Sequence, residues 1–81
     1  MKKTTEKFGI ESLTQREKET LRYLVYGLTN KQIAQQMNVS YHTIKAFVAS
    51  LLDKLGSERR SDLIVKALLY NIVEVDPKDF E

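Results

Sequence analysis

Residues 29–45 read TNKQIAQQMNVSYHTIK and contain the start signals of two helices in close succession. Thr29 and Gln32 have the spacing of a capping box, in which each side chain bonds to the backbone N–H of the other residue. A short apolar stripe follows at helical spacing: Ile33, Ala34 and Met37. Asn38 suits a left-handed turn, and Ser40 is a favoured N-cap. The stretch predicts a short helix, a tight turn and a second helix that starts near Tyr41.

A similar pattern lies upstream of this stretch. Thr14 and Glu17 form another capping box, and Leu13 supplies an apolar residue just before it. Apolar residues then recur at helical spacing: Leu21, Leu24, Val25 and Leu28. Gly27 is a stop signal, so a helix is expected between Thr14 and Gly27.

The helix that starts near Tyr41 should extend to about Leu55, because Gly56 is a typical C-terminal stop. One face is apolar and carries Ile44, Phe47, Val48, Leu51, Leu52 and Leu55. The opposite face carries only small or polar residues: His42, Lys45, Ala46, Ala49, Ser50 and Asp53. Such a flat face can lie close against another surface.

A fourth helix is predicted over about residues 58–73, and its apolar residues cover more than one stripe. One stripe can seal the core, and the remainder would form an exposed apolar patch. We expect this patch to be a homodimer contact made by Val65, Leu68, Leu69 and Ile72. The alternative is that the N-terminal lead or the C-terminal tail covers it.

Composition supports one small all-α domain. The chain has 81 residues, 42% hydrophobic and 30% charged, and no cysteine. No signal peptide or membrane-length apolar segment is found, which favours a cytoplasmic protein without disulfides. Residues 1–73 carry a net charge of +5 and residues 74–81 carry −3. We therefore divide the chain into a flexible lead (1–12), a mildly basic body (13–73) and an acidic tail (74–81).

Two short helices joined by a tight turn, the second with a small polar outer face, describe a helix-turn-helix. The motifs LTQREKE (13–19), GLTNKQIA (27–34), VSYHTIK (39–45) and KLG (54–56) with Arg60 resemble, in this order, the LuxR/GerE-type DNA-binding domain. The resemblance implies a compact four-helix (tetrahelical) domain from a bacterial regulator. It also implies that the second helix is a scaffold, that the third (about 41–55) is a recognition helix in the major groove, and that the fourth carries the dimer contact.

The sequence departs from the family pattern at three positions: Phe47 replaces a usual His, Ser57 a usual Val and Leu63 a usual Ala. Phe47 and Leu63 are larger than the usual residues, so we expect them to repack the core together. The receiver or small-ligand domain often fused to the family domain is not found, and a stand-alone regulator controlled by its expression level or by a partner is expected. The σ-factor region that reads −35 elements also opens with Leu-Thr-x-Arg-Glu. It usually has a longer segment after the first glycine, and is therefore the second choice.

The resemblance places Thr43-Ile44-Lys45 where family members contact DNA. We expect base contacts from Lys45, Ala46, Ala49 and His42, with the alanines touching thymine methyl groups. Phosphate contacts are expected from Thr43, Tyr41, Lys31, Asn30 and Ser40, near helix N-termini that attract anions. The alternative for each is an ordinary role: a solvated lysine or histidine, a helix-forming alanine, or a capping side chain.

No catalytic, cofactor or metal site is predicted. Glu17, Glu19, Glu58 and Asp62 are expected at capping or exposed positions with no cleft between them, and a catalytic site requires one. His42 is the only histidine and has no acidic partners at ligand spacing. Arg60 is expected to have a structural role by pairing with Glu17, Glu19 or Asp53.

The sequence therefore predicts a sequence-specific transcriptional regulator that binds double-stranded DNA as a homodimer. It is not expected to be an enzyme or to bind a membrane, and RNA polymerase or a longer regulator are further candidate partners. The alternative is a protein-interaction module that pairs with a longer regulator through the fourth helix. The acidic tail and the two alanines on the outer face favour that alternative.

Overall fold

A computed structural model describes residues 10–80, which form helices and no strand. The elements are η1 (Ile10–Ser12), α2 (Gln15–Val25), α3 (Asn30–Met37), α4 (Tyr41–Lys54), α5 (Arg60–Leu69) and η2 (Pro77–Phe80). The all-α, four-helix prediction is confirmed. Most of the lead predicted over residues 1–12 lies outside the described residues, although its last three residues form the 3-10 turn η1.

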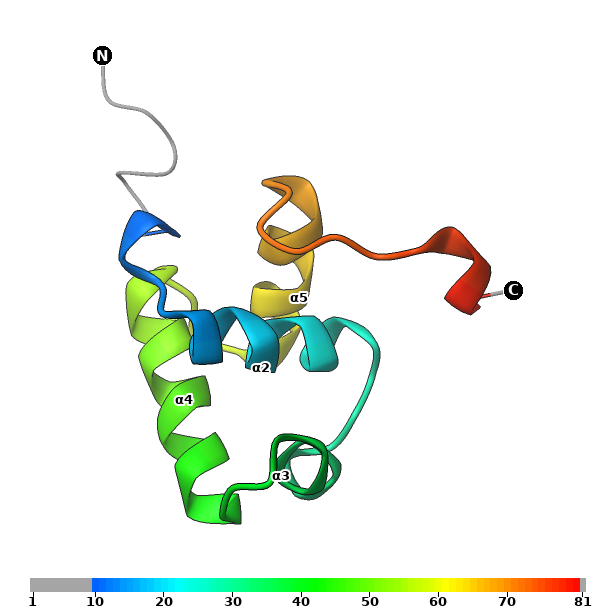
Figure 1. The fold of residues 1–81 in the computed structure, drawn as a ribbon. Helices are drawn as coiled ribbons and strands as arrows, with labels where there is room; N and C mark the ends of the chain where they lie inside the picture. The colour runs from blue at the N-terminus through cyan, green and yellow to red at the C-terminus, as the bar shows by residue number, and fades with distance from the viewer. Residues whose placement is uncertain (1–9, 81) are drawn as a thin grey trace.

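Helix α2 crosses the middle of the molecule and packs against both α4 and α5, while α3 packs mainly on the N-terminal part of α4 (Figure 1). One leucine-rich core joins all four helices. Its fully buried large side chains are Leu21, Leu24, Ile33, Ile44, Leu51, Leu55 and Leu63. Leu63 is completely buried, and Phe47 packs half-buried against the same core.

The predicted starts of α2, α3 and α4 are confirmed by the hydrogen bonds at their N-termini. Both capping boxes are complete, one at Thr14 and Glu17 and the other at Thr29 and Gln32. Ser40 accepts a bond from the Thr43 N–H and begins α4. These bonds satisfy donors that the first turn of a helix would otherwise leave free.

The turn between α3 and α4 depends on one residue in the left-handed region. Asn38 has φ 58° and ψ 44°, as expected from its place at the end of a helix. The Val39 N–H then bonds back to the Ala34 carbonyl at 3.0 Å. This closed turn fixes the angle at which α4 leaves α3.

The predicted bounds of the fourth helix, 58–73, are wrong at both ends. The helix begins at Arg60 and ends at Leu69, because Asn71 adopts a left-handed conformation with φ 54°. The Ile72 N–H bonds to the Ala67 carbonyl at 2.9 Å and closes the end of the helix. Ile72 therefore lies beyond α5, half-buried against the core, and not on the exposed helical face with Val65, Leu68 and Leu69.

After Asn71 the chain turns back along α2 and ends in η2. Val73 is buried, and the acidic segment that follows is held by Arg22 and Tyr26 of α2. Figure 1 shows this segment on the side of the molecule opposite α4. No helix in residues 10–80 is long and apolar enough to cross a membrane.

Candidate nucleic-acid interface

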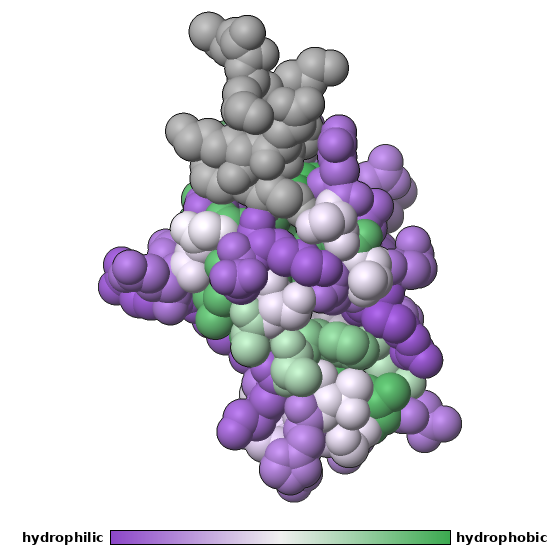
Figure 2. Space-filling view, turned by 90° about the vertical axis from the view of Figure 1, so that its left-hand side faces the viewer, coloured by the Kyte–Doolittle hydropathy of each residue, from purple (hydrophilic) through white to green (hydrophobic). Residues whose placement is uncertain are grey.

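Helix α4 separates its apolar and polar residues onto two faces. Ile44 and Leu51 are completely buried against the core, and the opposite side is exposed. His42, Lys45, Ala46 and Ala49 are all exposed and are spaced three and four residues apart, so they form one stripe along the helix. Figure 2 looks at the molecule from the α4 side and shows pale, weakly apolar surface with hydrophilic side chains around it.

The first turn of α4 holds the aromatic and basic residues of this surface together. Tyr41 is 48% exposed, and the Lys45 ammonium lies over its ring, 5.8 Å from the ring centroid. The His42 ring meets the Tyr41 ring edge-on at a centroid distance of 6.0 Å. The lysine is thus held at the N-terminal end of the helix, where the helix dipole is positive.

Ser40 and Thr43 are engaged in the cap of α4. The Ser40 hydroxyl accepts from the Thr43 N–H at 3.1 Å, and the two hydroxyl oxygens share a hydrogen bond at 2.9 Å. Because that bond uses one hydroxyl proton, the other is left to donate. The pair can therefore offer one donor to an anion without losing the cap.

The N-termini of α3 and α4 meet around a hollow of about 460 Å³. The hollow is lined by Gly27, Leu28, Thr29, Asn30, Lys31, Tyr41 and Arg60. It gathers three of the predicted phosphate-contacting residues, Asn30, Lys31 and Tyr41, on two elements. Lys31 is exposed at its edge and Asn30 is half-buried.

Arg60 has the structural role that the sequence predicts, but its predicted acidic partners are wrong. Its guanidinium donates to Asn30 Oδ1 at 2.7 Å and to the carbonyl of Leu28. The start of α5 lies against the turn between α2 and α3. The guanidinium of Arg60 therefore bonds to the neutral oxygens of that turn and not to a carboxylate. No pattern in the sequence signals this contact, since the two residues are 30 positions apart.

Glu17 lies in the predicted capping box and is also buried, with only 5% of it exposed. Its carboxylate accepts from the Thr14 N–H at 2.8 Å, from Lys54 Nζ at 2.8 Å and from the Ser50 hydroxyl. Burial raises the pKa of Glu17, but the bonds from Lys54, Ser50 and Thr14 outweigh it and lower the pKa to about 2. The carboxylate stays charged and fully bonded, and this leaves it unsuited to acid–base catalysis.

Ser50 therefore does not lie on the outer face of α4, where the sequence predicts it. It is half-buried and turned toward Glu17, and not toward solvent with Ala46 and Ala49. A serine hydroxyl is compatible with either face, so helical spacing alone could not distinguish them. The outer stripe is narrower than predicted and has lost one hydrogen-bonding group.

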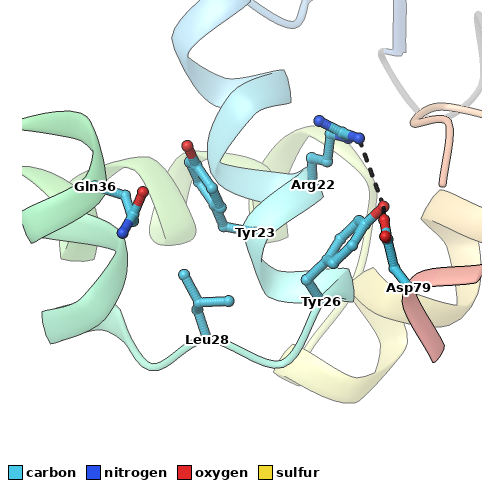
Figure 3. A pocket seen from close by; sticks show the side chains of 6 residues that line it. All are labelled: Arg22, Tyr23, Tyr26, Leu28, Gln36 and Asp79. Atoms are coloured by element: carbon cyan, nitrogen blue, oxygen red, sulfur yellow. Dashed lines mark hydrogen bonds between the residues drawn. The ribbon is translucent and has the colours of Figure 1, made fainter. Parts of the chain in front are cut away.

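A second hollow, of about 320 Å³, lies between α2, α3 and the C-terminal segment. Arg22, Tyr23, Tyr26, Leu28, Gln36 and Asp79 line it (Figure 3). The Tyr26 hydroxyl donates to Asp79 at 2.6 Å and accepts from the Asp76 N–H at 3.3 Å. These bonds tie the acidic tail to α2, so the tail does not cover the outer face of α4.

The described residues offer nothing that would hold a metal ion. Within residues 10–80 no three His, Cys, Asp or Glu side chains come together. The exposed helical stripe, the two helix N-termini and the basic residues beside them are instead features of the kind that nucleic-acid-binding proteins use.

Comparison with known proteins gives one family and several relatives. Residues 11–67 match the family model described as bacterial regulatory proteins, luxR family. The chain is 47% identical over 58 residues to the DNA-binding transcriptional activator DevR/DosR of Mycobacterium tuberculosis, which covers 72% of this chain and 27% of that protein. It is 42% identical over 60 residues to a nitrate/nitrite response regulator protein homolog of Haemophilus influenzae. That alignment covers 74% of this chain and 29% of that protein.

A third relative aligns over more of the chain. The response regulator protein VraR of Staphylococcus aureus is 32% identical over 74 residues, covering 91% of this chain and 34% of that protein. The chain thus spans about a third or less of the length of these curated relatives. No solved structure gives a significant match.

Proposed function

The chain belongs to the luxR family of bacterial regulatory proteins, and we propose that it reads specific sequences of double-stranded DNA with α4 in the major groove. The family is a non-enzymatic one whose common element is a helix-turn-helix DNA-binding domain used in transcription regulation. In this chain α3 is the scaffold helix and α4 is the recognition helix.

The observation that carries the proposal is the exposed stripe on α4. The major groove is about 12 Å wide and admits an α-helix. Ala46 and Ala49 add little bulk, so the helix can approach the base edges closely. Lys45 donates to guanine or to phosphate, His42 lies at the end of the stripe, and the alanines contact thymine methyl groups. With so few hydrogen-bonding groups, part of the specificity comes from DNA shape.

Phosphate contacts on both sides of the groove set the position of α4. Lys31 and Asn30 at the start of α3 face one stretch of backbone, together with Tyr41 across the hollow. The remaining donor of the Ser40 and Thr43 pair faces a phosphate near the N-terminus of α4. These contacts add affinity that carries no sequence information.

We further propose that the active form is a homodimer. Val65, Leu68 and Leu69 are 59%, 45% and 66% exposed on α5, which is unusual for three aliphatic residues on one short helix. Ile72, which the sequence assigns to this surface, is half-buried against the core and is not part of it. A dimer would read two half-sites about 34 Å apart, or a multiple of that distance.

The test is DNA binding over a series of salt concentrations, followed by selection of bound sequences from a random pool. Lys45→Ala should lower the slope of log affinity against log salt by about 0.9 and weaken binding if Lys45 meets a phosphate. If it reads a base, Lys45→Ala should also relax the selected sequence. Lys18→Ala is the matched control, because this exposed lysine lies on α2 beside Ile72 and Glu74. Absence of binding at low salt, or equal behaviour of the two variants, would contradict the proposal.

The same α5 surface supports a second candidate function, a module that pairs with a longer regulator. In that case the chain would form a stable complex with the partner and would show no selective DNA binding alone. Selection of an enriched palindrome by the isolated chain decides for the dimeric DNA reader.

A further inference from the structure

Arg60, the first residue of α5, bonds to Asn30, the first residue of α3. Its guanidinium bonds at the same time to the Asn30 side chain and to the Leu28 carbonyl, in the turn that precedes α3. It is half-buried and lines the same hollow as Lys31 and Tyr41. The contact therefore lies in the same hollow as the residues proposed to face DNA phosphate.

The bond to Asn30 fixes which end of the amide points away from the protein. A side-chain amide has one acceptor oxygen and one donor NH2 group. Because Oδ1 accepts from Arg60, the Nδ2 group is the end left for a phosphate oxygen. The bond to the Leu28 carbonyl holds the turn itself, so the position of the α3 N-terminus is set by the same side chain.

We propose that Arg60 is a positioning residue for DNA binding: it orients Asn30 and the start of α3 toward a backbone phosphate without contacting the phosphate itself. The inference rests on the proposed function. A positioning role differs from a direct ionic contact with phosphate, in which the positive charge of Arg60 would supply the affinity. Here the two-point geometry of the guanidinium matters, because a lysine ammonium lacks the planar fork that holds two separate oxygens.

The experiment compares five proteins: wild type, Arg60→Lys, Arg60→Met, Asn30→Ala and the double variant of Arg60→Lys with Asn30→Ala. Each is titrated with the selected duplex over a salt series, and its thermal unfolding is recorded to show that it is folded. We expect Arg60→Lys and Asn30→Ala each to weaken binding about three- to tenfold, the effect of one lost hydrogen bond. The double variant should be no weaker than either single one. The salt slope of Arg60→Lys should equal that of wild type.

Each alternative has its own outcome. If Arg60 only contributes charge to the phosphate, Arg60→Lys binds like wild type, while Arg60→Met loses affinity and lowers the salt slope by about 0.9. Losses that multiply in the double variant also overturn the inference, because they mean that the two side chains act independently. If wild type itself fails to bind DNA, the proposed function is overturned and the role of Arg60 with it. If wild type binds DNA selectively and Arg60→Lys binds equally well, the positioning role of Arg60 is overturned and the proposed function stands.

Discussion

Replacing Glu17 by glutamine removes the one buried carboxylate of the described fold and should make stability less sensitive to acid. Glutamine keeps the size of the side chain and can still complete the capping box, as Gln32 does at the start of α3. It cannot ionise, and it gives Lys54 a neutral partner in place of a charged one. The substitution therefore isolates the charge from the packing.

The magnitude follows from the pKa of Glu17. A carboxyl whose pKa falls from 4.5 in the unfolded chain to about 2 in the folded one stabilises the folded state by about 3 kcal/mol at neutral pH. Because the folded pKa is the lower one, this contribution is complete above pH 4.5 and disappears as the pH falls to about 2. Its source is the set of bonds from Lys54, Ser50 and the Thr14 N–H, which offset the cost of burial.

The assay is urea unfolding of both proteins between pH 2 and pH 7. We expect Glu17→Gln to be less stable by about 3 kcal/mol at pH 7 and the difference to shrink toward zero near pH 2. Glu58→Gln, at an exposed position, is the control and should stay within about 0.5 kcal/mol of wild type throughout. A difference between wild type and Glu17→Gln that does not change with pH would refute the reasoning, because it would mean that the ionisation of Glu17 does not contribute to stability.

Three further predictions concern other parts of the molecule. Asn38→Ala should destabilise the fold by about 1 kcal/mol in urea unfolding, because alanine disfavours the left-handed turn, whereas Asn38→Gly should be close to neutral. Leu69→Lys should shift sedimentation of the protein toward monomer while leaving its thermal unfolding nearly unchanged, since the side chain is 66% exposed. Tyr26→Phe should speed proteolysis of the C-terminal tail, because it removes the bond to Asp79, whereas Tyr23→Phe, in the same hollow, should not.

Helix starts were the most predictable part of this fold, because the capping signal is local. Thr14, Thr29 and Ser40 each bond to a backbone N–H three residues away, so the sequence contains both partners. The exposed stripe on α4 could be predicted for a similar reason. Its residues are spaced regularly around one helix, and the position of the apolar residues determines which side faces outward.

Contacts between distant residues could not be predicted in this way. Helical spacing places Ser50 on the outer face, because a serine is as compatible with solvent as with a buried carboxylate, and only the position of Glu17 on α2 decides between them. The sequence does not show where α5 ends, because apolar residues continue past the helix. The left-handed Asn71 redirects them, so Ile72 packs against the core without being helical.

Helix α5 has a larger part in the DNA-binding unit than its sequence suggests. At its start, Arg60 holds the turn before α3. Nearly two turns later, Lys66 donates to the carbonyls of Leu55 and Gly56, where α4 ends. Cations are favourable at the C-terminus of a helix, so this bond also complements the dipole of α4. One helix thus contacts both the turn before α3 and the end of α4. Because the same helix carries the exposed Leu69 surface, a partner bound there would rest on the element that sets the geometry of the helix-turn-helix.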